Sequence, residues 1–219
     1  MTNPLYYCLR RGQAAGAAGG SAPVATITHT KNGTFNLTMK GTAGAVVYCD
    51  PGNGDPVVEK TLNGNTSIYF SYVNDGTPRL VRLYGDVDQI KYLDLYAMSV
   101  TAVNLKVITS PAFYRLSLGS NNITNLDSIH LIKAFTYLAV NANPLVYTTR
   151  PWPAVTTGTF YFHNTVTTSD EVDQWLIDLN TALWSNCTIY IDGTNPAPTA
   201  AATAALAGLA SRGCTVYTN

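Results

Sequence analysis

A short pattern of alternating apolar residues followed by a polar turn recurs through the second half of the sequence. Residues 116–126 read LxLxxNxIxxL, and related copies begin at Leu93, Leu138, Phe160 and Ile189. The starting positions 93, 116, 138, 160 and 189 lie 23, 22, 22 and 29 residues apart. A unit of this size cannot bury its own apolar side chains, so neighbouring units must stack and share one continuous core.

Alternation along a strand predicts which side chains enter that core. The residues expected to point inward are Leu93, Leu95, Leu116, Leu118, Leu138, Val140, Phe160, Phe162, Ile189, Ile191 and Val216. Periods in the twenties with an LxLxxN centre resemble leucine-rich repeats. The resemblance implies an irregular leucine-rich-repeat solenoid over residues 87–219.

Two helices are expected near the C-terminus. Thr168 and Glu171 have the spacing of a capping box, in which each side chain satisfies a free backbone amide of the helix start. The apolar residues of 172–183 then recur three to four positions apart, which is the helical period. A second helix is expected over 200–210, before Gly213, and a final strand over 214–218.

Residues 24–86 read as short strands separated by turns. The expected strands are 26–30, 34–39, 45–49, 67–72 and 80–84, rich in β-branched and aromatic residues. Such spacing predicts a small β-sandwich. The turn of 47–55 and the hairpin from Tyr72 to Tyr84 resemble the polycystic-kidney-disease (PKD-like) immunoglobulin fold. The expected fold class is therefore mixed β and α/β: a small PKD/Ig-like sandwich over 24–86, followed by the solenoid.

Residues 1–23 differ in composition from the rest. A glycine- and alanine-rich stretch, 12–23, has too little side chain to pack a core and predicts a flexible tether. The segment before it is either a free tip or an arm that docks on a partner; the arm residues are Leu5, Tyr6, Tyr7, Leu9, Arg10 and Arg11. It is too short for a secretory signal, and its arginines follow the apolar run instead of preceding it.

The same alternation predicts which side chains the sheet offers to solvent. The exposed face is expected to carry Tyr92, Asp94, Tyr96, Arg115, Tyr137, Asn141, Tyr161, His163, Tyr190 and Asp192, with Ser117 and Tyr217 beside them. Tyrosine supplies rigid contact area and a hydroxyl at low entropic cost, so this row is typical of a face that binds protein or glycan. Tyrosine is also simply a good residue for an exposed strand, and that alternative stays open.

Charge and motifs argue against several function classes. Only 12% of residues are charged, and 13 basic side chains balance 13 acidic ones, which disfavours a nucleic-acid partner. No apolar run is long enough to cross a membrane. His29, His130 and His163 have no metal-ligand spacing around them, and no nucleophile motif is present. We therefore expect no catalytic residues, no metal, no cofactor and no enzyme activity.

Four cysteines, Cys8, Cys49, Cys187 and Cys214, include no CxxC motif. Cys187 and Cys214 each precede an inward position by two residues and could be neighbours. Free buried thiols are the favoured interpretation, because free cysteine packs like a small apolar residue.

At the level of architecture the chain resembles surface-exposed proteins of Bacteroides-type bacteria and of the phages that infect them. The resemblance implies a phage virion decoration or fibre protein on the virion surface. Residues 1–23 would contact a capsid or tail protein, and the exposed face would contact a host-surface protein or glycan. A homotrimer would suit a fibre. The alternatives are a bacterial cell-surface binding protein and, least favoured, an enzyme.

Overall fold

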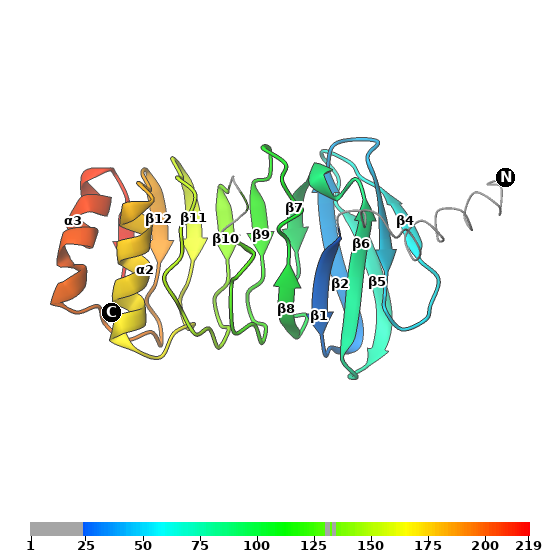
Figure 1. Cartoon of the computed structure of the whole chain (residues 1–219), viewed down its shortest axis with the longest axis horizontal. Coiled ribbons are helices and arrows are strands. Elements are labelled where there is room, and N and C mark those ends of the chain that lie inside the picture. The colour runs from blue at the N-terminus through cyan, green and yellow to red at the C-terminus, as the bar shows by residue number, and fades with distance from the viewer. Residues whose placement is uncertain (1–23, 130–131, 133–134) are drawn as a thin grey trace, which may run out of the picture.

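The computed structural model describes residues 24–129, 132 and 135–219 of the chain. Within these ranges the chain is built mainly from β-strands (Figure 1). The strands are β1 (Ala25–His29), β2 (Asn32–Gly41), β3 (Val46–Asp50), β4 (Val58–Thr61), β5 (Ile68–Asp75), β6 (Arg79–Gly85), β7 (Ile90–Asp94), β8 (Val100–Asn104), β9 (Arg115–Ser117), β10 (Tyr137–Ala139), β11 (Gly158–Tyr161), β12 (Cys187–Tyr190) and β13 (Thr215–Tyr217). The α-helices are α2 (Ser169–Thr181) and α3 (Thr203–Ser211), and the short 3-10 helices are η1 (Val87–Gln89) and η3 (Ala200–Ala202).

The strands form two sheets. The five-stranded sheet has the order β4-β3-β6-β1-β8, and all its pairs are antiparallel. The eight-stranded sheet has the order β13-β12-β11-β10-β9-β7-β2-β5. Its pairs are antiparallel from β5 to β7 and parallel from β7 to β13. The molecule is therefore elongated, with β4 and β5 near one end and α3 at the other (Figure 1).

The expected fold class is wrong. Instead of a PKD/Ig-like sandwich followed by an α/β leucine-rich-repeat solenoid, the chain is mostly β-sheet in two sheets, with only two short α-helices in the described ranges. The physical reason is strand pairing: β7 joins β2, and β8 joins β1, so both sheets cross the expected boundary at residue 86. The separate domains 24–86 and 87–219 stay a prediction.

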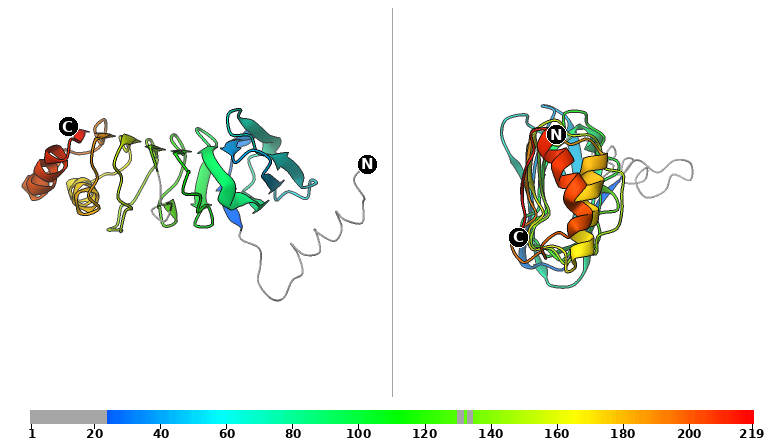
Figure 2. Two further views of the ribbon diagram at one scale, coloured as in Figure 1. Left: turned by 90° about the horizontal axis from the view of Figure 1, so that it is seen from above. Right: turned by 90° about the vertical axis from the view of Figure 1, so that its left-hand side faces the viewer.

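The predicted inward positions are confirmed. Every one of them from Leu93 to Ile191 is fully buried, and Val216 in the last strand is partly buried. One buried cluster runs from Ala25 to Cys214 and so connects the two sheets with the C-terminal helices. Figure 2 shows the two α-helices lying together at the C-terminal end. The outward prediction fails at Ser117, which is 3% exposed.

Buried asparagines explain the polar position of the recurring pattern. The amide oxygen of Asn121 accepts hydrogen bonds from the backbone N–H groups of Met98 and Val100, while its amide nitrogen donates to the carbonyls of Leu95 and Leu118. Asn143 and Asn195 make the same kind of bridge one and three strands further on. These side chains replace the backbone partners that the turns lack, which a buried turn requires.

The predicted helix start is confirmed. Thr168 caps α2 and accepts from the Glu171 backbone N–H, while the Glu171 carboxylate accepts from the Thr168 N–H, as a capping box requires. The second helix occupies the expected region as η3 and α3. Cys49, Cys187 and Cys214 are buried free thiols, as favoured; Cys8 lies outside the described residues.

His29, at the end of β1, is a fully buried histidine. Its Nδ1 accepts a hydrogen bond from the Lys31 backbone N–H, so the neutral ring carries its proton on Nε2, which faces the Tyr72 hydroxyl. The ring also stacks on Phe35 at 4.0 Å. Burial, and secondarily the nearby Arg79 guanidinium, lower the pKa of His29 to about 4.

We predict that the free energy of unfolding falls as the pH is lowered from 7 to 5. In the unfolded chain, a histidine with a pKa of 6.5 binds a proton as the pH falls toward 5. In the folded chain, His29 stays neutral until about pH 4. The free energy of unfolding should therefore drop by about 2 kcal/mol between pH 7 and pH 5. Urea unfolding at both pH values measures this. The variant His29→Gln should lose that part of the pH dependence, and an unchanged slope in the variant would refute the assignment.

Candidate binding face

The outer side of the eight-stranded sheet carries a row of aromatic residues. We call this row the tyrosine face and define it by Tyr92, Arg115, Tyr137, Tyr161, Tyr190 and Tyr217. Strand register brings the row together. Tyr92 and Tyr137 pair with Arg115 from opposite sides, and Tyr190 pairs with both Tyr161 and Tyr217. Residues 125 positions apart in the sequence thus share one surface, because six parallel strands run side by side.

The tyrosine rings of the later strands stack on one another. Tyr161 and Tyr190 have ring centroids 5.0 Å apart and planes within 3°, and Tyr190 and Tyr217 are 4.8 Å apart and within 5°. Tyr137 continues the row at 5.5 Å from Tyr161 with a tilt of 51°. Parallel strands lie about 4.8 Å apart, so equivalent side chains on successive strands meet at the stacking distance.

Stacking decides what the face offers to a ligand. The facing flat sides of Tyr161, Tyr190 and Tyr217 cover one another. Tyr217 lies on the edge strand β13, is 45% exposed and stacks on one described ring only, so a sugar ring could pack flat on its other side. Between the stacked rings, a sugar would have to displace a tyrosine. The row is therefore suited to hydrogen bonding through hydroxyls along its length, in addition to contact area.

Arg115 is the charged centre of the face. Its guanidinium carbon lies 3.8 Å from the ring centroid of Tyr137 and 5.5 Å from that of Tyr92, so two tyrosines flank the cation. Its Nε is buried and has no hydrogen-bond partner among the described residues. Arginine held between aromatic rings is pre-oriented, so binding through its remaining donors costs little conformational entropy.

Asp94 supplies the acidic group of the same region. One of its carboxylate oxygens accepts a hydrogen bond from the Tyr92 hydroxyl at 3.2 Å, and the other accepts from the Tyr96 backbone N–H at 2.9 Å. Burial, together with the nearby Asp94 charge, raises the pKa of Tyr92. Tyr92 therefore stays a neutral hydroxyl, and acidic and basic groups stand close together on the face.

The remaining predicted residues lie in the turns that follow the strands. Asn141 is half-buried beside Gly119, where an added Cβ would meet its amide oxygen at 2.7 Å and the Tyr96 ring at 3.2 Å. His163 is half-buried with its ring edge-on to Tyr161 at 6.0 Å, and Asp192 is half-buried after β12. Tyr96 is 54% exposed. None of the ten predicted face residues is buried, and that they form one binding face stays a prediction.

One member of the surface was missed by sequence reasoning. Lys40 of β2 lies with its Nζ 5.4 Å from the Tyr92 ring centroid. Strand alternation in β2 could have placed Lys40 on the outer face, but only the tertiary pairing of β2 with β7 puts it beside Tyr92. The predicted anchor residues Leu5, Tyr6, Tyr7, Leu9, Arg10 and Arg11 lie outside the described residues.

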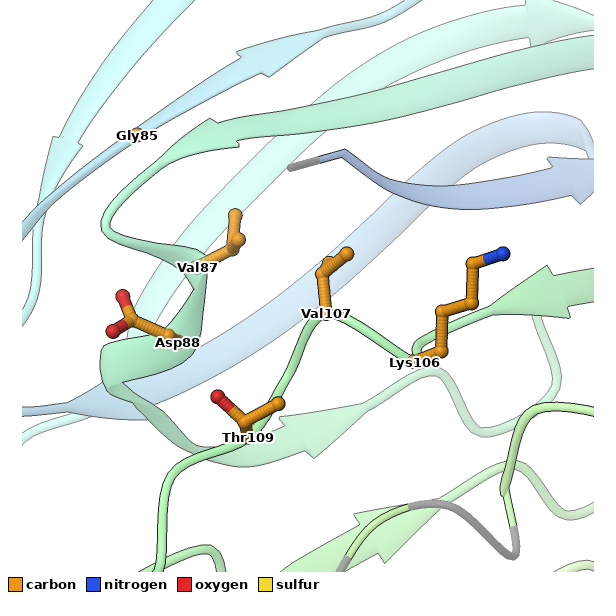
Figure 3. A pocket seen from close by; sticks show the side chains of 6 residues that line it. All are labelled: Gly85, Val87, Asp88, Lys106, Val107 and Thr109. Atoms are coloured by element: carbon orange, nitrogen blue, oxygen red, sulfur yellow. The ribbon is translucent and has the colours of Figure 1, made fainter. Parts of the chain in front are cut away.

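Two hollows on the surface of the described residues are lined by few reactive side chains. The first, of about 410 Å³, is lined by Gly85, Val87, Asp88, Lys106, Val107 and Thr109 (Figure 3). Asp88 and Lys106 stand on opposite sides of it, and its lining includes no histidine or cysteine. A second, of about 310 Å³, lies between Pro111 and Thr157 and is lined by neutral residues. Neither supplies a nucleophile with a neighbouring base.

The described residues contain neither a cluster of metal ligands nor a membrane-spanning helix. Among the described residues, no three His, Cys, Asp or Glu side chains converge as metal ligands would. No helix in the described ranges is long and apolar enough to cross a bilayer.

No family model matches the chain, and neither a curated protein nor a solved structure is significantly similar to it.

We predict that Tyr161 contributes to stability through its ring and not through its hydroxyl. Tyr161→Ala removes a ring that stacks on Tyr190 and lies tilted against Tyr137, and it should lower the free energy of unfolding by about 1–3 kcal/mol. Tyr161→Phe keeps both ring contacts and should change it by less than about 0.5 kcal/mol. Urea unfolding of both variants measures the difference. Equal losses in the two would show that the hydroxyl, and not the stack, matters.

Proposed function

We propose that the chain is a non-enzymatic phage virion protein whose tyrosine face binds a protein or glycan on the host surface. In this proposal residues 1–23 attach the chain to a capsid or tail protein, and the described residues hold the face outward. The observation that carries the proposal is the row from Tyr92 to Tyr217 across six adjacent strands, with Arg115 on the second of them.

Rigidity supports a binding role for this row. The side chains are held by stacking and by strand register, and the strands below them are buried on their inner side. A surface that is already ordered loses little entropy when a ligand binds. Aromatic residues and arginine are also the side chains that most often dominate binding energy.

The chemistry of the face favours a polar ligand. The stacked rings carry hydroxyls, Arg115 adds a guanidinium held between two tyrosine rings, and Asp94 adds an acceptor a short distance away. A ligand with hydroxyl, amide or carboxylate groups would match this pattern. A carbohydrate and a polar protein surface both meet that description.

We predict that removing the hydroxyls weakens attachment without unfolding the protein. The triple variant Tyr137→Phe, Tyr161→Phe, Tyr190→Phe keeps the ring stack and should lower the amount of protein bound to host cells at least about tenfold. Binding of labelled protein to intact cells measures this, with melting temperature as a check on folding. Tyr84→Phe, a matched change on the five-stranded sheet, should bind like the original chain. Undiminished binding by the triple variant would reject the face.

We predict that the first 11 residues are needed for virion attachment. A chain lacking residues 1–11 should keep the melting temperature of the full chain, because the glycine- and alanine-rich stretch 12–23 has too little side chain to pack a core. It should no longer be found in purified particles by mass spectrometry. Normal incorporation of the shortened chain would refute the anchor. Recovery of the full chain only from cell envelopes, and never from particles, would favour a bacterial cell-surface binding protein instead.

A further inference from the structure

The edge strand β5 differs from every other strand edge in the described part of the chain. It is eight residues long and lies at the end of the eight-stranded sheet, paired only with β2. Its sequence, IYFSYVND, contains no Lys, Arg, Glu or Pro. Exposed edges of this length usually carry such residues, because unpaired N–H and C=O groups invite another strand.

The other edges are short or already occupied. Strand β4 has four residues and includes Glu59 and Lys60. The outer backbone of β8 is bonded by the Ser128 hydroxyl, which accepts from the Leu105 N–H and donates to the Val103 carbonyl. Strand β13 has three residues. The edge strands β4, β8 and β13 are therefore short, charged or already hydrogen-bonded. Among the edge strands of the described residues, β5 alone has none of these features.

A hydrogen bond made by β2 shows which backbone groups of β5 are not paired with β2. The Asn36 N–H of β2 donates to the Met98 sulfur at 3.1 Å, so Asn36 faces away from β5. In an antiparallel pair, successive residues face opposite edges, so Phe35 and Leu37 face β5 and bond their partners Tyr72 and Phe70.

By the same alternation, the backbone N–H and C=O groups of Tyr69, Ser71 and Val73 face the open edge. The side chains of these three residues also lie on the outer side of the sheet. Tyr69 is 60% exposed and Val73 is 75% exposed, and Ser71 is exposed between them.

We propose that β5 pairs with β5 of a second copy of this chain to form a two-fold symmetric dimer. In the antiparallel register centred on Ser71, Ser71 lies opposite its own copy and Tyr69 lies opposite Val73 of the second chain. At each of these positions, the backbone N–H and C=O groups that do not pair with β2 point toward the second chain. The side chains of both β5 strands then lie on the same outer side of the joined sheet. The strand is thus complementary to itself, which a two-fold interface requires.

The charge distribution permits this pairing. The only residue of β5 that is charged at neutral pH is Asp75 at its end, and its carboxylate already accepts from the backbone N–H and the hydroxyl of Thr77. The centre of the interface therefore brings no like charges together. Tyr69 packing against Val73 is an aromatic and β-branched cross-strand pair, which stabilises antiparallel sheets. The dimer is independent of the adhesion proposed for the tyrosine face.

Sedimentation equilibrium of the full chain tests the inference. The original chain should show a mass twice that of the 23.5 kDa chain over a dilution series. Val73→Lys replaces the apolar partner of Tyr69 with a charged edge residue and should weaken the dimer at least about tenfold. Ser71→Pro removes an N–H that β2 does not use and should have the same effect. Val146→Lys is the matched control, because Val146 is 64% exposed and lies outside β5.

A cross-link tests the register. In a Cys8→Ser background, Ser71→Cys should oxidise to a covalent dimer, because opposite residues of an antiparallel pair lie within disulfide reach. Asn36→Cys, exposed on the same outer side of the neighbouring strand β2, should stay monomeric on a non-reducing gel. A monomeric original chain, a trimer, or a dimer that survives both Val73→Lys and Ser71→Pro would overturn the proposal. Dimers of the control and cross-linking of Ser71→Cys alone would support it.

Discussion

The pairing of β7 on both of its sides is the constraint on which the rest of the structure depends. On one side β7 is antiparallel to β2, and on the other it is parallel to β9. The strand therefore converts an antiparallel sheet into a parallel one without breaking the row of backbone hydrogen bonds. The tight turn after β7 also sends β8 into the opposite sheet, beside β1. Because both sheets continue through this point, the apolar cluster stays continuous from the first strand to the last helix.

Continuity of the sheet is what creates the tyrosine face. Strands in register hold equivalent side chains about 4.8 Å apart, and tyrosine rings at that spacing stack. Tyr161, Tyr190 and Tyr217 form such a stack. The same sheet places Tyr92 and Tyr137 on the two strands beside Arg115, so that both rings flank its guanidinium. The binding role proposed for this surface and the dimer proposed for β5 use different parts of one sheet. The first uses its outer side, and the second uses the open edge at the far end.

Several features could be predicted from local sequence. The alternation of leucines identified the buried residues because side chains of a strand point to opposite sides in turn. The capping box at Thr168 and Glu171 was recognisable because the interaction is completed within four residues. Other features depend on distant partners. Lys40 reaches Tyr92 only through the pairing of β2 with β7, and buried His29 meets Tyr72 from another strand. The predicted fold class was wrong for the same reason. A repeating period in the sequence does not show that β7 pairs with β2 and β8 with β1.

The amino-acid sequence by itself determined the alternating burial of the strands, the asparagines that complete their turns, the helix start at Thr168 and the tyrosines available to the outer side. Each of these follows from preferences that act within one strand, one turn or one helix. Only the tertiary structure decided that two sheets share one core, that β5 is left as an unprotected edge, and that the tyrosines stack instead of standing apart. Those outcomes arise from contacts between residues far apart in the chain. The local pattern allows many strand pairings equally, and the pairing that buries the most apolar surface and completes the backbone hydrogen bonds has the lowest free energy.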